Sequence, residues 1–471
     1  MKGSNESRKE QKTSRDGYPN REQLETKPYL GVQQAESASE SGISDVQLVQ
    51  TSNLLEMVLE RGNLIKAYKQ TVGNKGSHGT DQMTVSQLKS YLVANWQAVK
   101  SQILSGRYKP TAIRRVEIPK PDGGIRLLGI PTVLDRMIQQ AIAQILNGVF
   151  DHTFSESSYG FRKGRSAHDA IETARKYISE GYDWVVDIDL ERFFDRVNHD
   201  KLMALVARRV GDKRLLKLLR RYLESGIMIN GIVTSTDDGV PQGGPLSPLL
   251  SNIMLDELDK TLEKRGHRFV RYADDCNIYV RSKRAGERVY ESIKIYLETK
   301  LKLKVNESKS AVSRPFERKF LGFSFYLNKE GVPQIRVHEG SIKRFHKKVK
   351  PITARNWGVS MDYRLQKLSE ITNGWVNYFA KADSPVVFSD LEKWIRRRLR
   401  ACLWVSWKKV KTKRKNLIKL GMSAKSASRL ASTRKGAWRI SKCTPIHRTL
   451  TNQHLENLGF KSLTKRYHSV H

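Results

Sequence analysis

Two short segments that carry acids at strand ends constrain the fold of this chain most strongly. "VVDIDL" places Asp187 and Asp189 in an apolar run, and "RYADD" places Asp274 and Asp275 between two strand-like runs. Asp suits tight turns, so a plain hairpin turn is the simplest interpretation of the second segment alone. If the two segments pair in one sheet, their carboxylates converge at one edge. Because strand side chains alternate, Asp187 and Asp189 share a face, and strand geometry does not choose between them.

Carboxylates gathered from two strands repel one another unless a divalent cation lies among them. Oxygen ligands without His or Cys suit Mg²⁺. The three cysteines, Cys276, Cys402 and Cys443, are far apart, and the eleven histidines show no zinc-site spacing. Two Mg²⁺ ions about 3.5–4 Å apart can activate an attacking hydroxyl and stabilise a leaving pyrophosphate. The acids therefore predict nucleotidyl transfer.

The formal net charge of +37 indicates a polyanionic partner. An anionic membrane is the competing polyanion, but no apolar stretch approaches the length of a membrane span. The N-terminus "MKGSNESRKEQK" lacks the apolar core of a secretion signal. We therefore expect a protein that stays in a reducing cytoplasm, with nucleic acid rather than a membrane as its polyanionic partner.

Local patterns predict an alternation of helices and strands. Residues 1–46 are polar and are expected to form a disordered tail. The segment "RRVEIPKPDGGIRLLGIP" predicts a hairpin. Helices are expected at 54–72, 134–150, 198–210 and 214–226, and after the Gly/Pro loop in 239–266. Further along, Leu368, Ile371, Trp375 and Tyr378 recur at helical spacing and are expected to pack in a core.

Seven blocks in order resemble the group II intron-encoded reverse transcriptases and maturases. They are "IPKPDGGIRLLGIP", "SYGFRKGRSAHDAI", "DIDLERFFDRVNHDKL", "GVPQGGPLSPLLSNIMLDELD", "RYADD", "LKVNESKS" and "KFLGFSFY", and "GWVNYF" resembles the maturase-specific thumb. A lone Tyr-Ala-Asp-Asp is weak evidence, because a tetrapeptide recurs by chance. The ordered series is far more specific, and the likeness spans roughly residues 50 to 440.

The resemblance implies an α+β fold of the right-hand polymerase type, with fingers, a palm that carries an antiparallel sheet, and a helical thumb. The implied divisions are a disordered tail (1–46), an N-terminal extension with fingers (47–180), a palm (181–335), a helical thumb or maturase domain (336–420) and a basic nucleic-acid-binding segment (421–471).

The family pattern also chooses between the two aspartates of "VVDIDL". Its first catalytic Asp stands five residues before an aromatic residue under the incoming sugar, and Phe194 stands five after Asp189. Five residues after Asp187 stands Arg192 instead. The implied catalytic metal ligands for two Mg²⁺ ions are thus Asp189, Asp274 and Asp275. Phe194 is implied as a steric gate that favours deoxynucleotides, against the alternative of an ordinary core residue.

The remaining implied site residues bind substrates. Gln242 resembles a residue that lines the nucleotide pocket, Lys120 and Arg126 resemble fingertip residues that neutralise the triphosphate, and Lys309 resembles a lysine near the leaving pyrophosphate. Lys and Arg interleave with Trp394, Trp404 and Trp407 near the C-terminus, which favours nucleic-acid contact over a solvated face. The candidates there are Arg396, Arg397, Arg398, Lys408 and Lys409.

The implied function is RNA-directed DNA synthesis, together with maturase binding of intron RNA for splicing and retrohoming. The implied partners are group II intron RNA, an RNA template with DNA primer or target DNA, and dNTPs, in a bacterial cytoplasm. The tail shows no His/Cys cluster of an endonuclease, so an endonuclease-lacking, class C-like member is implied. The alternatives are a reverse transcriptase recruited to phage defence, CRISPR spacer acquisition or DNA repair, and a nonenzymatic RNA-binding splicing factor.

Overall fold

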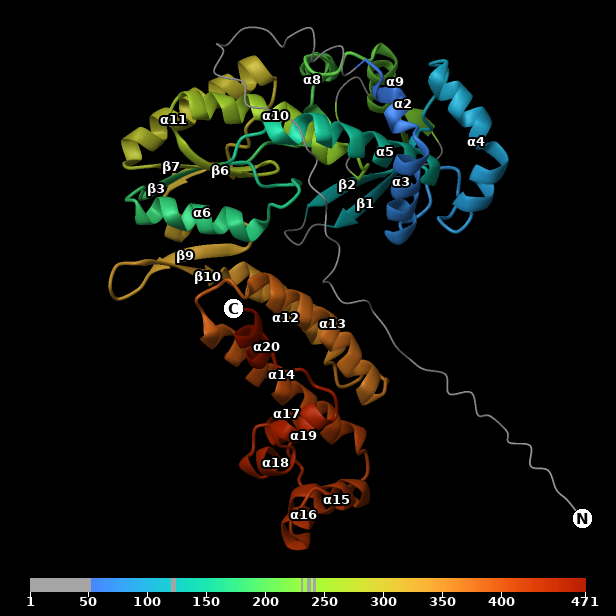
Figure 1. Ribbon diagram of the computed structural model, residues 1–471. Helices are drawn as coiled ribbons and strands as arrows, with labels where there is room; N and C mark the ends of the chain where they lie inside the picture. The colour runs from blue at the N-terminus through green and yellow to red at the C-terminus, as the bar shows by residue number, and fades with distance from the viewer. Residues whose placement is uncertain (1–51, 120–123, 230–231, 235–238, 240–242) are drawn as a thin grey trace, which may run out of the picture. The chain divides into compact units, whose positions relative to one another are not determined.

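The computed structural model describes residues 52–119, 124–229, 232–234, 239 and 243–471 (Figure 1). All the described residues belong to one compact unit. The expected disordered tail of residues 1–46 lies outside the described part. No helix in the described ranges combines the length and the apolar character that crossing a membrane requires.

The first sheet is built on the predicted hairpin. β1 (Ile113–Pro119) pairs antiparallel with β2 (Ile125–Ile130), and β1 also pairs parallel with β4 (Ile227–Ile229), which pairs with β5 (Ile232–Thr234). Around it, the predicted helix at 134–150 is confirmed, and the predicted helix at 54–72 is divided at Leu59 and Glu60. The helix at 134–150 is α5 (Val133–Phe150), and the divided segment gives α2 (Leu54–Val58) and α3 (Arg61–Gly73). A further helix, α4 (Leu88–Leu104), lies between α3 and β1 in the chain.

The second sheet joins the two acid-bearing segments, as predicted. Its strand order is β6 (Arg268–Tyr272), β7 (Asp275–Val280), β3 (Trp184–Ile188) and β8 (Ala311–Ser313), with every neighbouring pair antiparallel. Ile188 lies opposite Cys276, the residue that follows Asp275. The register therefore brings the C-terminal end of β3 beside the turn between β6 and β7.

Both faces of this second sheet are buried, because its side chains alternate between two apolar clusters. Val186 and Ile278 belong to the cluster that includes α10 (Ser247–Lys264) and α11 (Lys283–Tyr296). Val185 belongs to the cluster that includes α6 (Ala167–Ser179), and α6 and α11 lie on opposite sides of the sheet (Figure 1). The other elements of this region are η1 (Asp151–Thr153), α7 (Phe193–Arg196), α8 (His199–Ala207), α9 (Lys213–Leu223), η2 (Leu297–Leu301) and η3 (Pro315–Glu317).

The C-terminal part begins with the hairpin of β9 (Phe323–Leu327) and β10 (Pro333–Val337), so the predicted boundary at residue 335 falls inside β10. In α13 (Met361–Phe379) the predicted stripe packs against the core, with Leu368 buried and its three companions half-buried. The division into five domains stays a prediction. The other helices are α12 (Glu339–Ile352), α14 (Pro385–Ser406), α15 (Val410–Lys419), α16 (Ala424–Ala431), α17 (Ala437–Ile440), α18 (Thr444–Thr449), α19 (Asn452–Asn457) and α20 (Leu463–Val470).

Candidate active site

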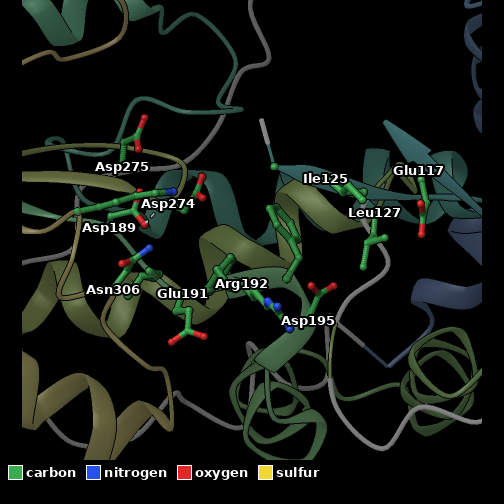
Figure 2. Close-up of a pocket in the computed structure, with 15 residues that line it drawn as sticks. Glu117, Ile125, Leu127, Asp189, Glu191, Arg192, Asp195, Asp274, Asp275 and Asn306 are labelled. Atoms are coloured by element: carbon green, nitrogen blue, oxygen red, sulfur yellow. Dashed lines mark ion pairs between the residues drawn. The ribbon is translucent and has the colours of Figure 1, made fainter. Parts of the chain in front are cut away.

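A cavity of about 820 Å³ lies where β3 ends and the β6–β7 hairpin turns. Figure 2 shows Asp189, Asp274 and Asp275 on one side of this cavity, and Ile125 and Leu127 of β2 on the other. The three acids that the sequence singles out therefore line one space. They come from segments that are 85 residues apart in the chain, since Asp189 precedes Asp274 by that number.

The backbone of Asp189 is held by the "NESKS" segment. Its N–H donates to Ser310 Oγ at 3.0 Å, and its carbonyl accepts from the Asn306 N–H at 2.8 Å. Lys309 Nζ lies 3.9 Å from Asp189 Oδ1, a long ion pair at the edge of the cavity. This arrangement fixes the residue after the strand and leaves its carboxylate with one nearby cation.

Asp187 has a different environment from Asp189. Its Oδ2 accepts from Arg318 Nε at 2.9 Å and from a second nitrogen of the same guanidinium. Burial raises the pKa of the Asp187 carboxyl, and the charge of Arg318 opposes that shift. Asp187 does not line the 820 Å³ cavity but a neighbouring one of about 780 Å³. A committed partner in Arg318 favours Asp189, rather than Asp187, as the acid available to a ligand.

The hairpin turn consists of Ala273 and Asp274, because Tyr272 pairs directly with Asp275. Ala273 has φ +57°, a left-handed conformation that costs a residue with a Cβ roughly 1–2 kcal/mol. Strain of this kind persists only where the surrounding structure enforces it. The turn thus places two consecutive carboxylates at the cavity by means of a backbone that Ala does not favour.

The acids destabilise one another's charge. The Asp275 side chain is open to the cavity, yet the surrounding protein, followed by the charges of Asp274, Asp187 and Asp189, raises its pKa to about 7. A cation among these groups would relieve that repulsion. None of the described residues that line the cavity is a His or Cys, so its donor set suits a hard divalent cation.

The three carboxylates are the type of ligand that such a cation prefers, but they do not surround a single metal position. Among the described residues, no three His, Cys, Asp or Glu side chains form a group that could hold a metal ion. The fit of Asp189, Asp274 and Asp275 to a metal therefore rests on their chemistry and shared cavity.

Phe194 also lines the cavity, at the start of α7. It is half-buried, whereas its neighbour Phe193 is buried in the core, and the two ring centroids are 5.2 Å apart. Arg192, in a left-handed conformation with φ +50°, turns the chain from β3 into this short helix. Both rings line the cavity, but Phe193 is buried in the core and Phe194 is the more exposed of the two.

The structure does not describe the side chains of three predicted nucleotide-binding residues. Lys120 and Gln242 lie outside the described residues, and Arg126 is described only as a backbone position of β2, opposite Ile118. Lys309 is described and lines the cavity. The roles of all four residues stay predictions.

The three consecutive arginines of α14 make contacts within the protein. Arg396 pairs with Glu392 and, at 3.0 Å, with Glu456. The Arg397 guanidinium lies 3.7 Å from the ring centroid of Trp438, and Arg398 donates to Thr353 Oγ1 and to backbone carbonyls. Lys408 and Lys409, between α14 and α15, are exposed instead. The predicted contacts of these five residues with nucleic acid stay untested.

Arg318, Asn306 and Ser310 belong to the site although the sequence did not single them out. Asn306 and Ser310 lie in the quoted "NESKS" block, so their neighbourhood was visible without their roles. Arg318 is 131 positions from its partner Asp187. The only signal for it was that a buried strand acid needs a counter-charge.

Comparison with known proteins gives two family matches. Residues 118–325 match the family described as reverse transcriptase (RNA-dependent DNA polymerase), and residues 342–421 match the group II intron maturase-specific domain. The first match contains the cavity acids, and the second contains the whole of α13, α14 and α15.

Three curated relatives are similar over about half of this chain. Protein YkfC of Escherichia coli K12 is 33% identical over 299 residues, which cover 55% of this chain and 78% of YkfC. Group II intron-encoded protein LtrA of Lactococcus lactis is 27% identical over 331 residues, covering 56% and 55%. The putative COX1/OXI3 intron 2 protein of Saccharomyces cerevisiae is 31% identical over 262 residues, covering 54% and 29%. The chain thus spans only about half of LtrA and less of the yeast protein.

Among solved structures, a chain of the partial Cas6-RT-Cas1–Cas2 complex shares 26% identity, with a TM-score of 0.35. The match covers 52% of this chain and 42% of that one.

Proposed function

We propose, because this chain belongs to the family of group II intron-encoded reverse transcriptases and maturases, that the cavity at the end of β3 is its polymerase active site. There it would extend a DNA primer on an RNA template. The observation that carries the proposal is that Asp189, at the end of β3, lines one cavity with Asp274 and Asp275 of the adjoining β6–β7 hairpin.

Reverse transcriptases depend on divalent metal ions, and we propose two Mg²⁺ ions for this chain. Asp189 and Asp274 would hold them, with Asp275 as the third carboxylate. When bound, such ions supply Lewis-acid activation of the primer hydroxyl and charge stabilisation for the leaving pyrophosphate. The raised pKa of Asp275 is consistent with this assignment, since it reflects burial first and then the negative charges of neighbouring acids, which a cation would compensate.

The other residues would bind and orient the substrates. Lys309 lies beside Asp189 and would neutralise the pyrophosphate as it leaves, with a proton to donate. Phe194 would lie under the sugar and exclude a 2′-hydroxyl. Arg126 and Lys120, at the β1–β2 hairpin, would neutralise the triphosphate, and Gln242 would line the nucleotide pocket.

We further propose that group II intron RNA is the principal macromolecular partner. A net charge of +37 favours a polyanion, and the match to the maturase-specific domain identifies the kind of RNA. Binding would help the intron to fold for splicing, and the polymerase would copy the RNA at a DNA target during retrohoming.

Replacing Asp274 with Asn tests the active-site assignment. Removal of one carboxylate removes charge that stabilises the transition state, so we expect cDNA synthesis to fall by about 10²–10³-fold or more. Intron RNA binding should change little, because the cavity acids are not cationic. Primer extension and filter binding measure the two effects separately.

Asp390→Asn is the matched control, because Asp390 is an exposed α14 acid whose partner is Lys393. It removes the same charge from a surface helix and should leave both measurements unchanged. Polymerisation by Asp274→Asn at the level of this control would refute the assignment of Asp274 as a metal ligand.

A further inference from the structure

Arg271, in "RYADD", is a fully buried cation two residues before Ala273, the first residue of the hairpin turn. Its side chain is 0% exposed, and it is the largest of the fully buried side chains described. Burying a guanidinium costs free energy unless every donor finds a partner. The partners therefore show what the residue is for.

Each guanidinium nitrogen of Arg271 donates to a well-placed acceptor. Nε donates to Asp259 at 2.7 Å, one terminal nitrogen donates to Asn252 Oδ1 at 3.0 Å and to the Ala273 carbonyl at 2.9 Å, and the other donates to Ser158 Oγ at 2.7 Å. Asp259 and Asn252 both lie on α10. The guanidinium thus ties the hairpin turn to a buried helix.

The carbonyl of Ala273 is a specific target. It belongs to the strained left-handed residue that precedes Asp274. Two residues upstream in the chain, Arg271 reaches around the turn and holds this carbonyl. A hydrogen bond from a buried cation is well suited to hold a backbone conformation that Ala alone does not favour.

The backbone at Gly160 also packs against the same turn. Gly160 lies so close to it that an added Cβ would be 2.2 Å from the Ala273 nitrogen. Asn252 joins the two supports, because its Nδ2 donates to the Gly160 carbonyl at 2.9 Å while its Oδ1 accepts from Arg271. The hairpin is also tied through its strand, since Arg271 N–H donates to the Ser157 carbonyl.

We propose that Arg271 is a positioning residue for polymerisation, which fixes the turn so that Asp274 and Asp275 face the cavity. It touches neither substrate nor metal and acts through the Ala273 carbonyl, with Asp259 balancing its charge. This inference rests on the proposed function, since it assigns a support to the carboxylates that the proposal assigns to the metal.

Arg271→Lys is the first test, because Lys keeps the charge but lacks the planar fork that reaches three directions. We expect kcat of primer extension to fall by about 100-fold, the scale of a small misplacement of reacting groups. Intron RNA binding should stay within about twofold, as the RNA contacts do not depend on this turn. Hydrogen exchange of the peptide that spans 268–280 should accelerate relative to the rest of the protein, which is a readout independent of activity.

Arg364→Lys is the matched control. Arg364 is also a buried arginine, 3% exposed, and it donates to the carbonyls of Ala354 at 2.9 Å and Trp357 at 3.0 Å. Its replacement should cost comparable stability in α13 while kcat at saturating primer–template stays within about twofold. Equal losses of kcat in the two variants, or a folded Arg271→Lys enzyme with wild-type kcat, would overturn the inference.

The double variant Arg271→Met with Asp259→Leu separates positioning from stability. An apolar pair of similar volume can replace a buried ion pair without loss of stability. We expect the thermal midpoint of the double variant to match that of the wild type. Its kcat should stay low, because no side-chain donor reaches the Ala273 carbonyl. Recovery of kcat together with stability would show that the pair is only structural.

If Asp274→Asn abolishes synthesis but Arg271→Lys does not, only this inference fails, whereas an active Asp274→Asn enzyme would defeat the proposed function itself.

Discussion

Asp187 lies within β3 and Asp189 follows the end of that strand, and among the described residues a guanidinium lies within hydrogen-bonding distance of Asp187 but not of Asp189. Arg318 therefore anchors one carboxylate in the sheet, and the cavity receives the other. At the scale of single residues, neighbours rather than strand position decide which acid is available for chemistry.

Phe194→Ala tests the proposed steric gate. Removing the ring should leave room for a 2′-hydroxyl, so the ratio of kcat/KM for ribonucleotides to that for deoxynucleotides should rise, by about tenfold or more if the discrimination is worth 1.4 kcal/mol. Single-nucleotide primer extension with the two sugars measures the ratio.

Phe193→Ala is the matched control, because Phe193 is the adjacent ring and is buried in the core. Loss of this ring should cost about 3–5 kcal/mol of stability. It should lower kcat/KM for ribonucleotides and deoxynucleotides by the same factor, so that their ratio stays unchanged. An unchanged sugar ratio in a folded, active Phe194→Ala enzyme would place the gate elsewhere.

The acids could be predicted from the sequence as residue types, but their individual roles could not be derived from strand geometry alone. Alternation left Asp187 and Asp189 equivalent, and only the five-residue spacing to Phe194 separated them. Arg318 supplies an independent physical reason, yet it is 131 positions away and carries no motif. Arg271 stood inside the quoted "RYADD" block, but nothing in a strand pattern reveals that its side chain is buried.

At the scale of elements, the turn between β6 and β7 depends on a segment that is not itself a strand. Ser158 bridges to Arg271 in a parallel arrangement, and the Tyr159 N–H donates to the Arg271 carbonyl at 2.9 Å. The segment covers β6, which lies at the end of its sheet's strand order, and places Gly160 against the turn.

Gly160→Ala should displace the hairpin, because its Cβ would meet the backbone of Ala273 and Tyr272, which cannot move aside as a flexible side chain can. We expect cDNA synthesis to fall by about tenfold or more while intron RNA binding persists. Primer extension at saturating primer–template, with the thermal midpoint measured in parallel, checks this outcome.

Gly148→Ala provides the control for the added methyl group. Gly148 lies within α5, and its Cβ would meet nothing within 4 Å. There Ala should stabilise the helix by up to about 1 kcal/mol and leave synthesis unchanged. Wild-type synthesis by Gly160→Ala would mean that the turn tolerates the shift, and the close approach would then have no catalytic consequence.

The pairing of β3 with the β6–β7 hairpin could be predicted, because acids at strand ends demand a common reason. The bracing segment around Ser158 could not, since a single parallel bridge has no alternating apolar pattern. The break between α2 and α3 was also missed, because helical spacing continues across Leu59 and Glu60, and the nearby Gly62 lies inside α3 rather than at the break.

At the scale of the whole molecule, the excess of positive charge does not all face solvent. Arg396 is committed to two glutamates, and its side chain is only 14% exposed. Arg397 and Arg398 are engaged by Trp438 and Thr353. Their replacement would therefore alter helix packing as well as any contact with RNA. Lys408 and Lys409 offer a cleaner measure of the electrostatic footprint.

Intron RNA binding should weaken steeply between about 50 and 200 mM salt, because each phosphate that a Lys or Arg neutralises releases a counterion. The double variant Lys408→Gln with Lys409→Gln should reduce the slope of log K against log salt by about 1–2, with an unchanged thermal midpoint, because both side chains are exposed.

The matched control is Lys283→Gln with Lys343→Gln, since these exposed lysines already pair with Glu287 and Glu339 along their own helices. Filter binding over a salt series gives each slope. A flat plot for the wild-type protein would contradict a large electrostatic footprint. Equal slopes for the wild type and the Lys408/Lys409 variant would place that footprint elsewhere on the chain.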